Sequence, residues 1–230
     1  GHRQLIIDNW SLVTVMSYPQ APWTLQGYAY QTLQLLECDR VRPLIPSELN
    51  LVSVFPGKTV GGVYLSNYGA GSVLEYSELI VVAGFVSYGG EIGGWVSHIY
   101  VDNPDSVAGG REIWGLPKEI ADFTWTDRNV TVRQGDRILC CLKYHQQNFG
   151  LPIPLGASSF SSLNSNLLLF PAQLKARLGL VSSQLEIPPE SPFGGLNLGQ
   201  PWLTVHADQM ELTVGQPSIV GQRDLEFNVV

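Results

Sequence analysis

Short apolar runs rich in valine, isoleucine, leucine, tyrosine and threonine recur along the chain, and glycines stand between them. This pattern is typical of many strands joined by turns. Side chains alternate between apolar and polar in several runs, as a half-buried strand requires. We expect strands at residues 27–36, 60–68, 72–86, 94–101, 121–126, 129–134, 137–145 and 203–214. Gly135-Asp136 predicts a hairpin turn with positive φ between two of them.

Helical signals are few. The strongest begins at Asn103-Pro104, where a capping residue precedes a proline at the first helical position, and it predicts a helix toward Trp114. A second helix is expected from Pro171 to Leu178, begun by its proline. The proline- and glycine-rich residues 184–199 predict an ordered excursion or lid. The fold class is therefore α+β and β-dominated, with residues 1–230 forming one domain.

Composition narrows the classes of protein. Hydrophobic residues make up 44% of the 230 residues and charged residues 14%, which is enough apolar material for a sizeable core and excludes a disordered chain. The net charge of −7, with no cluster of basic residues, argues against a nucleic-acid partner. No apolar run reaches the 18 or so residues of a membrane span.

Cysteine and histidine give no support for a metal or cofactor. Three cysteines, two of them adjacent, form no disulfide framework, and no Cys/His spacing resembles a zinc site. A reduced compartment follows, so we expect a cytoplasmic protein. Because Gly1-His2 is not a natural start, the plastid stroma stays open if an upstream transit peptide was removed. Phosphate-binding G-x-G-x-x-G and nucleophile-elbow G-x-S-x-G motifs are also missing.

One lysine occupies an apolar stretch. The chain has four lysines (Lys58, Lys118, Lys143 and Lys175), and Lys118 alone follows Trp114-Gly115-Leu116-Pro117. An amine held among apolar side chains is a candidate nucleophile, because desolvation favours its neutral form. The alternative is a lysine whose stem is buried while its head reaches solvent.

Three segments carry a resemblance to a known family. They are Tyr100-Val101-Asp102-Asn103 followed by Gly110-Arg111-Glu112 and Pro117-Lys118, then Tyr76-Ser77-Glu78, and Ile45-Pro46-Ser47-Glu48-Leu49. Together they resemble the acetoacetate decarboxylase superfamily over roughly residues 25–125. The Gly-Arg-Glu and Pro-Lys block is the most specific of the three.

The resemblance implies an antiparallel, cone-like β-barrel with peripheral helices, in an oligomer, with the lysine inside its cavity. It also implies a carbon-carbon lyase that joins a small-molecule ketone or aldehyde to Lys118 as a Schiff base without a cofactor. Glu78 then serves as proton donor or acceptor, or else as the partner of an arginine such as Arg111. We expect the substrate-binding residues to be Arg111, Glu112, Leu116, Trp114 and Tyr76.

Two departures alter the expected chemistry. Acetoacetate decarboxylases carry a second lysine directly after the reactive one, whereas this chain has Glu119. Neighbouring residues of a strand face opposite sides, so we expect Glu119 to point away from Lys118. The arginine that recognises the substrate carboxylate in the decarboxylases is replaced by Gly27. A neutral ketone or aldehyde, with aldol condensation or dehydration, is therefore favoured over decarboxylation.

Two other functions remain open. Residues 61–68 and Gly115-Leu116-Pro117 look similar to the plant and algal branch linked to neoxanthin formation. That likeness favours a member that forms no Schiff base and holds a large apolar ligand such as a carotenoid. The third possibility is an inert binding or assembly protein on the same scaffold.

Overall fold

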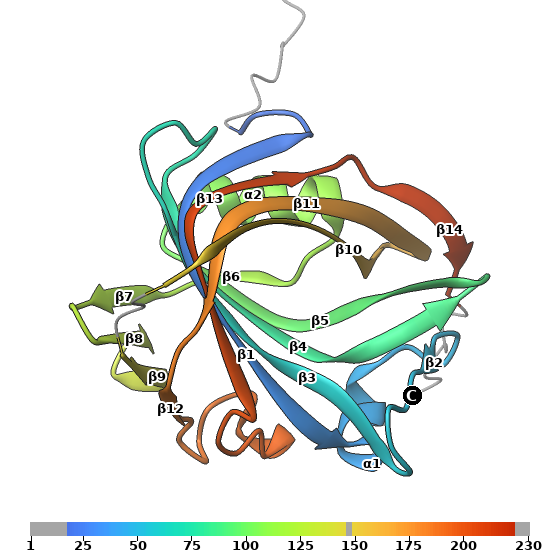
Figure 1. Ribbon diagram of the computed structural model, residues 1–230. Coiled ribbons are helices and arrows are strands. Elements are labelled where there is room, and N and C mark those ends of the chain that lie inside the picture. Colours follow the sequence, from blue (N-terminus) through green and yellow to red (C-terminus); the bar gives the residue numbers. More distant parts are fainter. Residues whose placement is uncertain (1–17, 146–148, 224–230) are drawn as a thin grey trace, which may run out of the picture.

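Seven strands close into a barrel in the computed structural model, which describes residues 18–145 and 149–223 (Figure 1). The order around the barrel is β4-β3-β1-β13-β11-β10-β5, and β5 pairs back to β4. All neighbours are antiparallel except β10 and β5, which pair in parallel over two residues. The expected β-dominated barrel is confirmed. The barrel strands are β1 (Trp23–Glu37), β3 (Lys58–Tyr68), β4 (Tyr76–Tyr88), β5 (Glu91–Val101), β10 (Leu151–Leu163), β11 (Asn166–Leu180) and β13 (Leu203–Val214).

Alternating side chains give each barrel strand an inner and an outer face. In β3, for example, Tyr64 and Tyr68 face the interior, whereas Val63 and Leu65 pack on the outside. Bulges interrupt β1 between Gly27 and Ala29 and β4 near Val82. A bulge bends a strand and increases its twist, which closes a sheet of few strands into a barrel.

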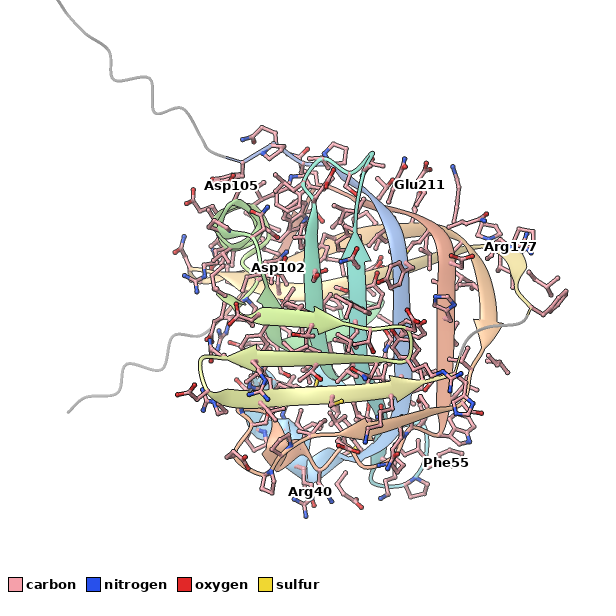
Figure 2. The ribbon with its side chains drawn as sticks, turned by 90° about the vertical axis from the view of Figure 1, so that its left-hand side faces the viewer. Arg40, Phe55, Asp102, Asp105, Arg177 and Glu211 are labelled. Atoms are coloured by element: carbon pink, nitrogen blue, oxygen red, sulfur yellow. The ribbon has the colours of Figure 1, made fainter. Side chains whose placement is uncertain are left out.

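A second sheet covers part of the outer face of the barrel. Its strands are β7 (Asp122–Trp125), β8 (Asn129–Gln134), β9 (Arg137–Tyr144) and β12 (Ser183–Glu186), and they run across the barrel strands in Figure 2. Val130, Val132 and Leu142 of this sheet are fully buried and share a hydrophobic core with Val63 and Leu65. The predicted turn between β8 and β9 is confirmed, since Gly135 has φ +60°.

Helix α2 (Pro104–Trp114) has the bounds that its capping signals predict. The Asn103 side chain accepts hydrogen bonds from the backbone N–H groups of Asp105 and Ser106, and Gly115 ends the helix with φ +62°. The helix packs against β10, β5 and the short strand β6 (Lys118–Ile120), which pairs in parallel with β5. The remaining elements are α1 (Cys38–Val41), η1 (Arg42–Leu44), β2 (Asn50–Leu51), η2 (Gly194–Leu196) and β14 (Ser218–Gln222).

The structure tests two expectations in the C-terminal half, a helix at Pro171–Leu178 and an excursion or lid at residues 184–199. The helix expected at Pro171–Leu178 is wrong, because this segment lies within β11. Its inward residues alternate with exposed ones, and that period of two is the stronger signal. Pro171 fits because it stands between the residues of β11 that pair with β14 and those that pair with β13. Residues 184–199 form an ordered excursion that buries Phe193, Leu196 and Leu198 in the outer core, rather than a lid.

Histidine burial makes the stability of this fold pH-dependent. His206 stacks on Tyr30 at 4.4 Å between ring centroids, and burial lowers the pKa of His206 below its ordinary value of 6.5, although Asp208 partly opposes the shift. The unfolded chain therefore binds a proton at a higher pH than the folded protein. Stability should fall as the pH drops below about 6.5 and stop changing below the folded-state pKa. In urea unfolding at pH 7.5 and 5.5, His206→Phe should reduce this difference. An unchanged difference would contradict the assignment to His206.

Candidate active site

The barrel encloses a cavity of about 280 Å³. Side chains from all seven barrel strands line it, together with residues of β6 and α2. Most of them are aliphatic or aromatic. Among the described lining residues Lys118 is the one basic group and Glu78 the one acidic group. A single pair of opposite charges therefore faces a cavity whose other described lining residues are uncharged and mostly apolar.

Lys118 and Glu78 form a buried ion pair. The lysine Nζ lies 2.8 Å from the glutamate Oε1, and the two residues are 3% and 4% exposed. The lysine Nζ also donates a hydrogen bond to Ser106 Oγ, 3.0 Å away in the first turn of α2. Strand pairing sets this geometry, because Glu78 in β4 lies opposite Val101 in β5 while Lys118 lies beside Ile99.

Tyrosines complete the surroundings of the pair. The Tyr68 hydroxyl donates to Glu78 Oε2 at 3.2 Å and shares a hydrogen bond of 3.1 Å with the Tyr64 hydroxyl. Burial, together with the Glu78 carboxylate nearby, raises the pKa of Tyr68, Tyr64 and Tyr76 above the ordinary value of 10.0. These phenols therefore stay neutral and act as donors at physiological pH.

Aromatic rings also face the Lys118 ammonium. Its Nζ lies 5.0 Å from the Tyr76 ring centroid and 5.7 Å from that of Trp23. A cation within about 6 Å of an aromatic face is stabilised by the ring quadrupole. The ammonium therefore has one carboxylate, one hydroxyl and two rings around it.

Glycines in α2 allow the helix to approach the lysine. A Cβ at Gly110 would lie 2.4 Å from Lys118 Cδ and 2.6 Å from Cε, and a Cβ at Gly109 would lie 2.6 Å from the Trp23 ring. The Gly109-Gly110 pair weakens the helix intrinsically. Both residues are nevertheless glycine because the Lys118 stem and the Trp23 ring occupy the space that a larger side chain would need.

Tyr76, Trp114 and Leu116 line the cavity as expected for substrate-binding residues. Arg111 and Glu112 do not, because α2 turns both toward solvent. Their position corrects the expectation that they contact a substrate. Arg111 Nε instead donates to the Lys118 carbonyl oxygen at 2.8 Å. Glu112 accepts a hydrogen bond from the Tyr18 hydroxyl, which raises the pKa of Tyr18.

The structure gives a physical reason for the two departures from the family pattern, Glu119 and Gly27. Glu119 lies on the outer face of β6 and is exposed, where it accepts a hydrogen bond from Gln134 Nε2 at 2.8 Å. The expectation that it points away from Lys118 is confirmed. At Gly27 a Cβ would lie 1.9 Å from the Asn67 carbonyl oxygen, so the backbone leaves no room for any side chain there.

Sequence reasoning missed Ser106, Tyr68 and Tyr64. Ser106 follows the predicted helix cap by three residues, a position that points its side chain beside the helix start. Tyr64 and Tyr68 are four residues apart in an expected strand and thus share one face. Neither signal indicates which face meets Glu78, because that depends on the pairing between β3 and β4.

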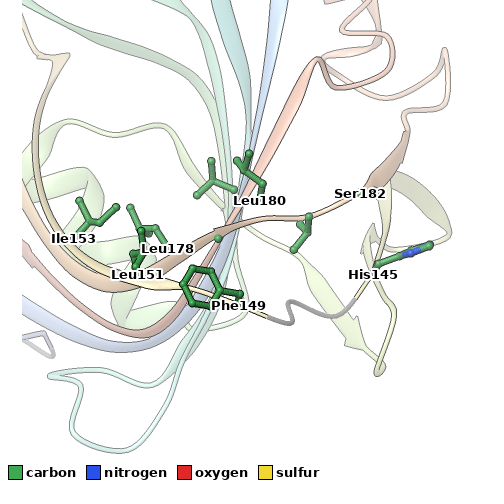
Figure 3. Close-up of a pocket in the computed structure, with 10 residues that line it drawn as sticks. His145, Phe149, Leu151, Ile153, Leu178, Leu180 and Ser182 are labelled. Carbon is green, nitrogen blue, oxygen red and sulfur yellow. The ribbon is translucent and has the colours of Figure 1, made fainter.

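A second hollow on the surface lacks such a charge pair. A groove near the start of β10 is lined by Phe149, Leu151, Ile153, Leu178 and Leu180 among others, with His145 and Ser182 at its side (Figure 3). Its described lining residues include no pair of acidic and basic side chains. Within residues 18–145 and 149–223 no group of three metal-ligating side chains gathers. No helix in these ranges is long and apolar enough to cross a membrane.

The buried pair should be strongly coupled. Glu78→Gln leaves the Lys118 ammonium buried without its counter-charge, so we expect a loss of about 3 kcal/mol in the free energy of unfolding. Lys118→Met combined with Glu78→Gln should recover a large part of that loss, because neither charge is then buried alone. Urea unfolding of the two single variants and the double variant measures the coupling. Additive losses would show that the two groups do not interact.

Gly110 should determine where the amine lies. Gly110→Ala places a methyl group against the Lys118 stem, so the Nζ–Glu78 distance should exceed hydrogen-bonding length in a crystal structure of the variant. The free energy of unfolding should fall by about 1 to 3 kcal/mol. Gly109→Ala is the matched control in the same helix, because it crowds Trp23 and should leave the ion pair intact. An unmoved lysine in Gly110→Ala would contradict this role.

Comparison with known proteins agrees with the fold. Residues 22–149 match the family described as acetoacetate decarboxylase. Protein NEOXANTHIN-DEFICIENT 1 of Solanum lycopersicum is 32% identical over 111 residues, which are 48% of this chain and 37% of that protein. Acetoacetate decarboxylase of Burkholderia ambifaria is 27% identical over 113 residues, 49% of this chain and 44% of the enzyme. The matched part thus spans less than half the length of these curated relatives.

Solved structures show the same fold. The acetoacetate decarboxylase of Legionella pneumophila has a TM-score of 0.68 at 18% identity, covering 89% of each chain. The enduracididine biosynthesis enzyme MppR, complexed with the condensation product of pyruvate and imidazole 4-carboxaldehyde, has a TM-score of 0.60 at 12% identity, covering 88% of this chain and 90% of that one. With the family match extending over more than half of its residues, this chain belongs to the acetoacetate decarboxylase family.

Proposed function

We propose that this protein is an enzyme in which Lys118 forms a Schiff base with a neutral ketone or aldehyde. The observation that carries the proposal is the Lys118–Glu78 pair, 2.8 Å apart and buried in an apolar cavity. An ordinary lysine is almost fully protonated at neutral pH and is then no nucleophile. Here a proton acceptor stands within hydrogen-bonding distance of the amine.

Formation of the iminium needs no acid or base other than Lys118 and Glu78. On entry of an apolar substrate, the Lys118 ammonium transfers a proton to Glu78 Oε1, which turns a charged pair into a neutral one. The neutral amine attacks the carbonyl carbon to give a carbinolamine. The Glu78 carboxylic acid returns the proton to the carbinolamine oxygen, and water leaves as the iminium forms. Tyr68 holds Glu78 in place through its hydrogen bond to the second carboxylate oxygen.

The iminium favours bond changes at the neighbouring carbon. It withdraws electrons from an adjacent C–H or C–C bond, so an enamine forms in place of a carbanion. Decarboxylation, aldol cleavage or condensation, and dehydration share this intermediate. No arginine is among the described residues that line the cavity, and the backbone at Gly27 leaves no space for one. These features favour aldol or dehydration chemistry over decarboxylation. MppR, a fold relative, was solved with a condensation product.

The other side chains then have distinct roles. Tyr76, Trp114 and Leu116 contact the substrate from the cavity wall. Arg111 holds the Lys118 backbone through its carbonyl oxygen. For assembly, the apolar side chains of Leu151, Leu155 and Leu180, each at least 50% exposed, support a homo-oligomer. The cytoplasm, or the plastid stroma, remains the proposed location.

A second candidate is a binding or converting role toward a large apolar ligand such as a carotenoid, without a Schiff base. Two observations favour it: the apolar lining of the cavity and the likeness to proteins named for a deficiency in neoxanthin. In that case Lys118 and Glu78 form a polar anchor at one end of an apolar site.

Borohydride trapping tests the first proposal. After incubation with a methyl ketone or an aliphatic aldehyde, reduction should add the mass of the reduced probe to Lys118, detected by peptide mass spectrometry. Lys118→Arg should lower the labelling at least about tenfold, because arginine forms no stable imine under these conditions. Lys143→Arg is the matched control, since the Lys143 side chain is 53% exposed and pairs with Glu186. Labelling that does not depend on Lys118 would end the proposal. Co-purified pigment retained by Lys118→Met would support the second candidate instead.

A further inference from the structure

Gln31 lies across the barrel from Lys118. A single row of paired residues connects the two positions through β1, β3, β4, β5 and β6: Gln31, Tyr64, Ile80, Ile99 and Lys118. All five line the cavity. In a barrel of seven strands, positions three or four strands apart stand on opposite walls. The cavity thus has a polar group on each of two facing walls.

Hydrogen bonds fix the orientation of the Gln31 amide. Its Nε2 donates to the carbonyl oxygens of Thr32 at 2.8 Å and Val63 at 3.2 Å. These bonds occupy both amide protons, and the reversed orientation would press Oε1 against two other acceptors. The Oε1 atom makes no hydrogen bond within the part of the chain that the structure describes. It is therefore presented as an acceptor by a side chain that lines an apolar cavity.

An acceptor that has no protein partner can bind a ligand that donates a hydrogen bond to it. The atom can bind a hydroxyl or an N–H group, but it repels a carboxylate. Ser158 and Ser159 also line the cavity, yet a hydroxyl both donates and accepts, so they do not select between these groups. The lining tyrosines and serines can donate as well as accept, whereas Gln31 Oε1 can only accept, so Gln31 favours a ligand group that donates.

We propose that Gln31 is a specificity-determining residue, whose Oε1 accepts a hydrogen bond from a hydroxyl or N–H group at the far end of the carbonyl substrate. The substrate class is then a neutral hydroxy ketone, hydroxy aldehyde or amide-bearing analogue with an apolar middle. This inference rests on the proposed function, because it takes the carbonyl end to lie at Lys118. It extends that function by assigning the chemistry of the opposite end.

Ligand binding measured by tryptophan fluorescence tests the proposal without requiring any covalent step, since Trp23 and Trp114 line the cavity. The probes are methyl ketones of increasing chain length, each compared with the same ketone bearing a terminal hydroxyl or a terminal carboxylate. At the best-fitting length the hydroxy ketone should bind about three- to tenfold more tightly than the parent ketone. The keto acid should bind most weakly.

Gln31→Met removes the acceptor while keeping the length of the side chain. The variant should bind the hydroxy ketone and the parent ketone with similar dissociation constants, and its affinity for the parent should change less than about twofold. Gln26→Met is the matched control, because Gln26 is an exposed residue of the same strand. It should retain the wild-type preference. If Gln31→Met does not fold, the order of the three probes in the wild type still tests the proposal.

The outcomes separate this proposal from the Schiff-base chemistry. A wild type without preference for the hydroxy ketone, or a folded Gln31→Met variant that keeps it, overturns the role of Gln31. A clear preference in fluorescence without borohydride labelling of Lys118 supports the Gln31 site while the Schiff-base proposal fails. Labelling of Lys118 without any preference gives the reverse result.

Discussion

The buried contact between Lys118 and Glu78 is the interaction on which the rest of the site depends. Burying either charge costs several kcal/mol unless partners surround it, and the surrounding residues meet that requirement. Ser106 accepts from the ammonium, Tyr68 donates to the carboxylate, and two aromatic rings face the cation. These partners come from α2, β1, β3 and β4, so the pair joins elements that are distant in the chain. In the proposed mechanism the same two charges supply the reactive amine, because a proton transfer between them leaves two neutral groups.

Backbone proximity decides what the cavity can contain. Gly110 leaves the space that the Lys118 stem fills, and Gly109 leaves the space for Trp23. Gly27 has the opposite effect, since β1 and β3 approach so closely there that a Cβ would collide with the Asn67 carbonyl oxygen. The missing arginine is therefore a consequence of how two strands pair, and a single substitution at Gly27 cannot restore it. The proposed nucleophile Lys118 and its proposed acid-base partner Glu78 therefore lie on a scaffold that leaves no room for a side chain at Gly27.

Sequence patterns correctly predicted the features that depend only on residues close together in the chain. The cap at Asn103-Pro104 predicted α2 with its observed bounds, and strand alternation placed Glu119 opposite Lys118. The error at Pro171 arose because a proline was interpreted as a helix start, although the alternation around it was that of a strand. Strand β10 escaped recognition, since its exposed Leu-Pro-Ile-Pro-Leu run has prolines where a strand signal is expected. The prediction that Glu78 and Lys118 share one site came from the family resemblance. The contacts of Tyr68 and Gln31 depend on register between strands, which no local pattern encodes.

The two walls of the cavity place different demands on a ligand. Under the proposed mechanism the ligand needs an electrophile at the Lys118 end, since its carbonyl carbon must reach an amine that is hydrogen-bonded to Glu78. At Gln31 the requirement is a hydrogen-bond donor, because both amide protons already bind the protein and only the oxygen remains. A keto acid meets the first requirement and fails the second, and Lys118, the one cation among the described lining residues, is already paired with Glu78. Change of substrate in such a barrel therefore needs no change at the nucleophile. It needs only that β1, on the opposite wall, carry a hydrogen-bond acceptor in place of a group that binds anions.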